Sequence, residues 1–149
     1  MKLNVLVVED DEFKQRQIVD FLGQQDWCGD SIIACSVVGG IAQIDESEFD
    51  LVILDMALPN YDGGSDAGQG LGGIAVFRYL RQIAPRIPVV VLTQFEALRE
   101  GSALVDTDTL KSRLEHEFGQ QFAALAKYKI ASDEWKHCLN LVADSVRNK

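Results

Sequence analysis

The chain has 149 residues, of which 47% are hydrophobic, and this length and composition suit one compact domain with a single core. Its formal net charge of −9 disfavours contact with the phosphate backbone of nucleic acids, which normally depends on clusters of Lys and Arg. The short apolar run near the amino terminus is soon followed by acids and suits neither a signal peptide nor a membrane span. We therefore expect a soluble, cytoplasmic protein without a nucleic-acid or membrane partner.

Five short runs rich in Val, Ile, Leu or Ala predict β-strands. They are Leu3 to Val8, Ser31 to Cys35, Leu51 to Leu54, Pro88 to Leu92, and Phe122 to Lys127. Near-continuous apolar runs of this length are typical of a parallel sheet that is buried on both faces.

Segments with helical spacing lie between and after these runs. Their markers are Ile18, Val19 and Leu22 before Gly23; Ile41 and Ile44; Phe77 and Leu80 before Pro85; Leu110, Leu114 and Phe118 after the cap candidates Asp106 and Asp108; and Trp135, Cys138, Leu139, Val142 and Val146 after the N-cap candidate Ser132. The strand and helix alternation, repeated five times, predicts a single α/β domain over residues 1–149, a doubly wound five-stranded parallel sheet with helices on both faces.

Acidic residues stand at two predicted strand ends. Glu9 and Asp10 follow the first strand, and Asp55 ends the third. In a flavodoxin-like strand order, 2-1-3-4-5, these two strands flank the switch point of the sheet, so the carboxylates converge there. Clustered carboxylates repel one another unless they share protons or bind a cation, and Mg²⁺ prefers oxygen ligands of this kind. A carboxylate beside Mg²⁺ can attack phosphorus, which makes Asp55 a candidate phosphoacceptor.

Two further groups suit phosphoryl binding. Thr93 ends the fourth predicted strand, and its hydroxyl can donate to a phosphoryl oxygen. A lysine near the end of the fifth strand can pair with the phosphoryl charge. Lys127 and Lys129 both qualify, and because they are two residues apart they would point to the same face of a strand. We assign the role to Lys127, because an uninterrupted apolar stretch leads directly into it, and keep Lys129 as the alternative.

Three stretches resemble the motifs of receiver domains from two-component response regulators, of the chemotaxis-regulator kind. VLVVEDDE is similar to the acidic pair, DLVILDMALPNYDG to the phosphoacceptor motif and PVVVLTQF to the switch-hydroxyl motif. The resemblance covers Lys2 to about Gln94 and is loose beyond.

The resemblance implies a role for each matched residue. Glu9 and Asp10 correspond to the metal-binding acidic pair, with Asp10 as the direct ligand, and Asp55 to the phosphoacceptor. The backbone carbonyl of Ala57 corresponds to the third protein ligand of Mg²⁺, and Thr93 to the switch hydroxyl.

The chain departs from the family pattern in its second half. It lacks the Lys-Pro dipeptide after the fifth strand, and Ala124 or Ala126 stands where an aromatic switch residue is usual. The segment between Thr93 and Lys127 is longer than in the family. A glycine-rich insertion at about residues 63–72 follows the phosphoacceptor motif and is expected to be a loop.

The resemblance implies a phosphorylation-dependent signalling switch that accepts a phosphoryl group on Asp55 from a histidine kinase or phosphotransfer protein. Such a domain modifies itself and is not an enzyme that turns over a free substrate. A pseudo-receiver, which binds partners without phosphorylation, is the alternative. An aspartyl-phosphate phosphohydrolase is disfavoured, because Ala57 stands where those enzymes carry a second acid.

Overall fold

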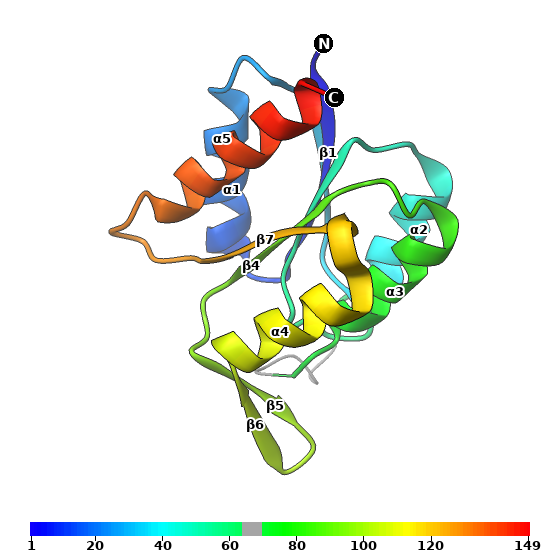
Figure 1. Ribbon diagram of the computed structural model, residues 1–149, viewed down its shortest axis with the longest axis vertical. Helices are drawn as coiled ribbons and strands as arrows, with labels where there is room; N and C mark the ends of the chain where they lie inside the picture. Colours follow the sequence, from blue (N-terminus) through cyan, green and yellow to red (C-terminus); the bar gives the residue numbers. More distant parts are fainter. Residues whose placement is uncertain (64–69) are drawn as a thin grey trace.

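Five parallel strands form the main sheet of the computed structural model, which describes residues 1–63 and 70–149 (Figure 1). The strands are β1 (Leu3–Val8), β2 (Cys28–Ala34), β3 (Leu51–Leu54), β4 (Val89–Thr93) and β7 (Phe122–Lys127). Their order is β2-β1-β3-β4-β7, and each neighbouring pair is parallel. Since β7 is the fifth strand of this sheet along the chain, the predicted flavodoxin-like order is confirmed.

Helices cover both faces of the sheet, as predicted (Figure 1). On one face lie α1 (Glu12–Gly23) and α5 (Glu134–Arg147), and on the other lie α2 (Val37–Glu46), α3 (Gly73–Ile83) and α4 (Thr107–Phe118). Alternate residues of each buried strand feed two separate cores. For example, Val5 and Val7 of β1 pack toward α1 and α5, while Leu6 and Val8 pack toward α2, α3 and α4.

Capping residues fix where the helices begin. Asp11 is the N-cap of α1, and its carboxylate accepts a hydrogen bond from the backbone N–H of Lys14 at 3.0 Å. Asp106, one of the two predicted candidates, caps α4. The structure places the N-cap position of α5 at Asp133, one residue after the expected Ser132, and the Asp133 side chain makes no capping hydrogen bond. The Ser132 hydroxyl accepts a hydrogen bond from the Glu134 N–H at 3.2 Å, as a capping side chain does.

A β-hairpin that the sequence pattern did not indicate lies between β4 and α4. It consists of β5 (Ala97–Glu100) and β6 (Ala103–Asp106), which pair antiparallel and project beyond α4 (Figure 1). Gly101 makes the turn with a φ of 62°, a conformation that favours glycine. Leu98 and Val105 are buried in the core that also holds α4. The hairpin therefore accounts for the long segment between Thr93 and Lys127.

Within the described residues, no helix is both long enough and apolar enough to span a membrane.

Candidate phosphoryl and metal site

Three carboxylates meet at the carboxyl ends of β1 and β3. One oxygen each from Glu9, Asp10 and Asp55 lies within 4.8 Å of the others. The main chain holds both segments in place, since the Asp55 N–H donates to the Val8 carbonyl at 3.0 Å and the Glu9 N–H donates to the Ala34 carbonyl at 2.9 Å. Glu9 and Asp55 are buried, and Asp10 is partly exposed. The structure thus brings together the three acids that the sequence singled out.

Asp11 follows these acids in the chain but has a different role. Its carboxylate caps α1, and its own N–H donates to Oε2 of Glu9 at 3.1 Å. The side chain is exposed. Asp11 therefore starts the helix and orients Glu9.

Lys14 is the cation of the site, and sequence reasoning did not select it. Its side chain is only 1% exposed, and its ammonium group forms an ion pair with Glu9 and lies 3.5 Å from Oδ1 of Asp55. The same ammonium donates a hydrogen bond to the Leu92 carbonyl of β4 at 2.7 Å. One available signal was its spacing, because Lys14, Ile18 and Leu22 lie on one face of α1 and the other two are core residues.

Burial and mutual repulsion shift the protonation of the two buried acids. Burial, reinforced by the charge of Asp55 and opposed by Lys14, raises the pKa of Glu9 to about 8. Burial also raises the pKa of Asp55; Lys14 opposes this shift and Asp10 adds to it. The three carboxylates outnumber the one ammonium, so a further cation would favour their ionised forms.

The donor set fits a hard divalent ion such as Mg²⁺. Oε1 of Glu9 and Oδ1 of Asp55 are buried and accept no hydrogen bond, although both face the Lys14 ammonium. Asp10 adds a third, more accessible carboxylate. Ala57 is buried next to the site, and its backbone N–H hydrogen-bonds the Asp55 carboxylate. Oxygen ligands of this kind are those that Mg²⁺ prefers.

Thr93 and Lys127 lie at paired positions at the carboxyl ends of β4 and β7. Thr93 is buried, and its Oγ1 accepts a hydrogen bond from the Phe95 N–H at 3.2 Å, which leaves its hydroxyl proton available to donate. The Lys127 ammonium forms an ion pair with Glu96, just before the hairpin, and makes no ion pair with Asp55 in the part of the chain that the structure describes. Lys129 is exposed. Among Lys14, Lys127 and Lys129, Lys14 alone contacts Asp55 in the described structure. The pairing of Lys127 or Lys129 with a phosphoryl group stays a prediction.

The segment after Asp55 is held by close backbone packing. The Gly73 N–H donates to the Met56 carbonyl at 2.8 Å, and the N–H groups of Val37 and Val38 in α2 donate to the carbonyls of Pro59 and Asn60, both at 2.9 Å. Residues 64–69 of the predicted insertion lie outside the described residues. Gly72 and Gly73 are not part of a free loop, since they precede and begin α3 directly against this segment.

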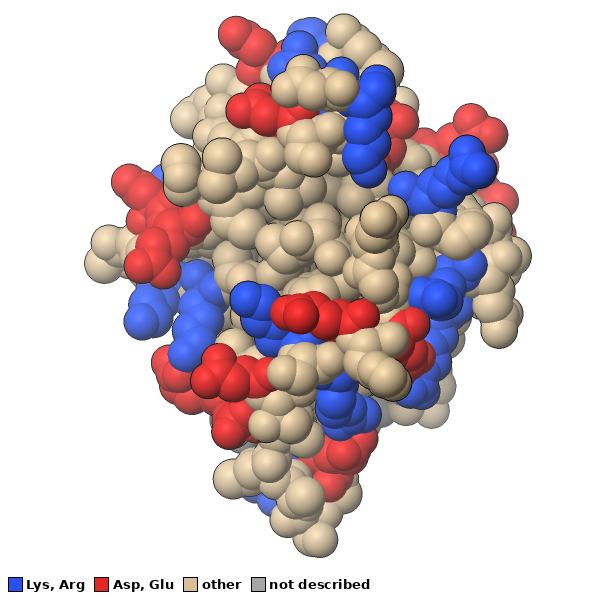
Figure 2. Space-filling model, viewed as in Figure 1, with Lys and Arg blue, Asp and Glu red and all other residues tan. Residues whose placement is uncertain are grey.

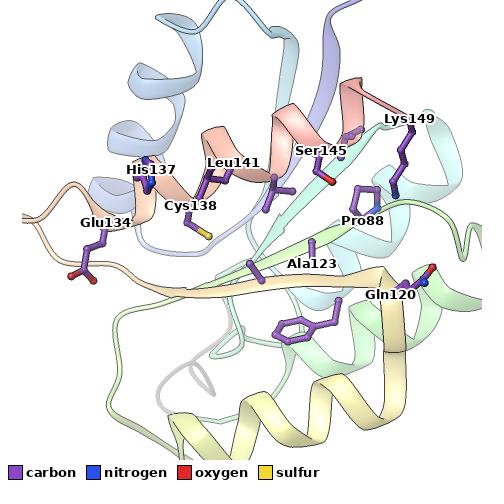
Figure 3. A pocket seen from close by; sticks show the side chains of 13 residues that line it. Pro88, Gln120, Ala123, Glu134, His137, Cys138, Leu141, Ser145 and Lys149 are labelled. Atoms are coloured by element: carbon purple, nitrogen blue, oxygen red, sulfur yellow. The ribbon is translucent and has the colours of Figure 1, made fainter.

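A groove on the described surface lies away from the acids. It has a volume of about 790 Å³ and runs between α5 and the sheet-edge strand β7 (Figure 3). Figure 3 shows Cys138 and Ser145 on α5, with Ala123 on β7 below the helix and Pro88 to the right of Ser145. Figure 2 shows this face with uncharged residues at its centre and charged side chains around them. No acid of the candidate site lines the groove.

Known proteins share both the sequence pattern and the fold. The chain is 21% identical to the uncharacterized protein y4jR of Sinorhizobium fredii over 90% of this chain and 92% of that protein. It is 28% identical to a protein-glutamate methylesterase/protein-glutamine glutaminase of Trichodesmium erythraeum over 73% of this chain, but spans only 27% of that protein.

One solved structure has the same fold over nearly the whole length of both chains. It is the CheY-like response regulator receiver domain protein of Methanospirillum hungatei, with a TM-score of 0.71 at 15% identity, covering 99% of this chain and 98% of that chain. The family model described as the response regulator receiver domain matches residues 5–111, from β1 into α4. The chain therefore belongs to the response regulator receiver domain family.

Proposed function

We propose that the chain is a phosphorylation-dependent signalling switch in which Asp55 accepts a phosphoryl group in the presence of Mg²⁺. The observation that carries this proposal is the position of Asp55. It is buried at the end of β3, within reach of two further carboxylates and in contact with one buried ammonium. Membership of the receiver family supports the same role. The phosphodonor is then a histidine kinase or a phosphotransfer protein, and the output is a change in binding to another protein.

In the proposed reaction, a carboxylate oxygen of Asp55 attacks the phosphorus of a phosphohistidine. A new O–P bond forms and the N–P bond breaks, and the leaving imidazole nitrogen keeps the electron pair and takes a proton from solvent. Glu9, Asp10, Asp55 and the backbone carbonyl of Ala57 would hold Mg²⁺. When bound, the metal supplies charge neutralisation and orients the phosphoryl oxygens for in-line attack. The Thr93 hydroxyl donates to a phosphoryl oxygen. The chemistry modifies the domain itself, so we assign it no catalytic turnover.

Intact-mass measurement after incubation with acetyl phosphate and Mg²⁺ tests this function. We expect the wild-type chain to gain the mass of one phosphoryl group and Asp55→Asn to gain none. Asp62→Asn is the matched control, because Asp62 lies in the same connection but its carboxylate accepts a hydrogen bond from Ser36 at 2.5 Å. Labelling of Asp55→Asn at the wild-type level would exclude Asp55 as the acceptor.

A pseudo-receiver is the second candidate function, and Lys14 is the observation that favours it. A buried ammonium already compensates part of the negative charge at Asp55, so the fold has an internal cation in its acidic cluster. Under this alternative, the wild-type chain stays unlabelled with acetyl phosphate. Asp55→Asn then binds the output partner with the same affinity as the wild type.

A further inference from the structure

A phosphoryl group on Asp55 would add negative charge to a buried cluster that already has three carboxylates. Mg²⁺ would compensate part of this charge, and a side-chain cation in direct contact would compensate more of it. The sequence offered Lys127, with Lys129 as the alternative. In the structure, the Lys127 ammonium pairs with Glu96, and Lys129 is exposed.

The alternation of β7 explains the position of Lys127. Ala126 and Tyr128 of this segment belong to the core beside α1 and α5, whereas Leu125 packs toward the core on the opposite face of the sheet. Lys127 lies between Ala126 and Tyr128, so its side chain points to the opposite face of the sheet. There its ammonium pairs with Glu96, the residue before the hairpin. At the end of β7, the side chain on the α1 face is therefore that of Tyr128 and not a lysine.

Lys14 reaches the site from α1 and is held on several sides. Its ammonium contacts Glu9 and Asp55 and donates to the Leu92 carbonyl. The Tyr128 ring lies on another side, with its centroid 5.7 Å from the Lys14 Nζ. Tyr128 is itself fixed, because its N–H donates to the Thr93 carbonyl at 2.7 Å. The ammonium is thus positioned before any phosphoryl group arrives.

We infer that Lys14 of α1 is the catalytic lysine of this receiver domain, the group that neutralises Asp55 and then pairs with a phosphoryl oxygen carried by it. Lys127 has a different role, which is to anchor the start of the hairpin through Glu96. This assignment rests on the proposed function, because it requires a phosphoryl group on Asp55. No proton leaves Lys14 in the transfer, and its ammonium remains a donor throughout.

The space around Lys14 is compatible with this role. A cavity of about 360 Å³ lies at this edge of the sheet, and Lys14, Tyr128, Asp11 and Gln94 are among its lining residues. The ammonium itself is shielded from bulk solvent, which strengthens its interaction with an anion. A phosphoryl group bonded to Asp55 would still lie within range, since only 3.5 Å separate the Lys14 Nζ from Oδ1 of Asp55.

Matched substitutions of the two lysines test the assignment. Lys14→Gln and Lys127→Gln are compared with the wild-type chain for the rate of labelling by acetyl phosphate with Mg²⁺, and for Mg²⁺ affinity by calorimetry. We expect Lys14→Gln to lower the labelling rate by about tenfold to a hundredfold. Its Mg²⁺ affinity should stay equal or rise, because a competing positive charge has been removed. Lys127→Gln should label within about twofold of the wild-type rate.

The Mg²⁺ measurement separates a phosphoryl contact from a merely structural role, since a distorted site would lose metal affinity and labelling together. Labelling of Lys14→Gln at the wild-type rate, or a larger loss in Lys127→Gln, would overturn the assignment while leaving the proposed function intact. A wild-type chain that cannot be labelled would overturn both.

Folding of the variants is checked by circular dichroism, because Lys14 is buried among acids. If Lys14→Gln does not fold, the wild-type chain provides a second test through NMR of its lysine ammonium groups. Addition of Mg²⁺ and beryllofluoride, a phosphoryl analogue, should shift the signal of one solvent-shielded ammonium. That signal should persist in Lys127→Gln. An analogue-induced shift that disappears in Lys127→Gln would overturn the assignment.

Discussion

Asp10 and Asp11 are neighbours in the sequence but differ in their contacts. Asp10 is one of the three clustered acids, whereas Asp11 caps α1 and is exposed. We predict that Asp10→Asn weakens Mg²⁺ binding by about tenfold or more, because the site loses an ionised ligand. Asp11→Asn should keep both the metal affinity and the stability, since Asn caps a helix about as well as Asp. Calorimetric titration with Mg²⁺ measures both, and equal losses in the two variants would contradict the assignment of Asp10.

At the scale of single residues, the acids were predicted and Lys14 was not, because its only signal was its spacing with Ile18 and Leu22. Glu9, Asp10 and Asp55 follow predicted strands directly, so the topology of the sheet alone brings them together. Lys14 lies in a polar stretch of α1. Whether its side chain enters the site depends on which face of that helix packs against the sheet. Lys127 was placed correctly at the end of β7, but strand alternation and the unforeseen Glu96 contact direct its ammonium elsewhere.

At the scale of single helices and strands, too, some features were predicted and others were not. The five strands of the main sheet have strong apolar patterns and were predicted, although β2 begins at Cys28, three residues before the expected start. The hairpin of β5 and β6 was missed, because each of its strands has four residues and only Leu98 and Val105 are buried. Short strands with one buried residue each give little periodic signal.

The start of α3 fixes the segment that holds the phosphoacceptor. A Cβ atom added at Gly73 would lie 2.2 Å from the Asp55 carbonyl oxygen and 2.8 Å from the Met56 Cα. We predict that Gly73→Ala lowers the free energy of unfolding by about 1–3 kcal/mol, because backbone on both sides must shift. It should also slow labelling of Asp55 by acetyl phosphate.

Gly70→Ala is the matched control for this prediction, because it lies in the same glycine-rich stretch and its added Cβ would meet no atom within 4 Å. Urea unfolding of the two variants measures the difference. The control should stay within about 0.5 kcal/mol of the wild type. Equal stabilities for Gly73→Ala and Gly70→Ala would show that the close approach to Asp55 does not constrain this segment.

At the scale of the whole molecule, the fold followed from the order of elements, because a repeated strand and helix alternation leaves few topologies. The family followed from the motifs around Glu9, Asp55 and Thr93. The net charge of −9 adds a general self-repulsion to the local repulsion among Glu9, Asp10 and Asp55. Monovalent salt screens the repulsion that comes from the net charge, but only a bound cation relieves the repulsion among the three clustered acids. Mg²⁺ should therefore stabilise the domain beyond its effect on ionic strength.

Thermal unfolding with Mg²⁺ measures the stabilisation that comes from a cation bound at the three acids. At a Mg²⁺ concentration of about a hundred times its Kd, binding to the folded state alone contributes about 2.7 kcal/mol, which for a chain of this length raises the Tm by about 5–10 °C. NaCl at the same ionic strength is the control and should give a smaller shift. Asp10→Asn should respond to the two salts alike, because its metal site is impaired while its overall charge is nearly unchanged. A wild-type Tm that rises equally in MgCl₂ and NaCl would mean that the three acids bind no divalent ion.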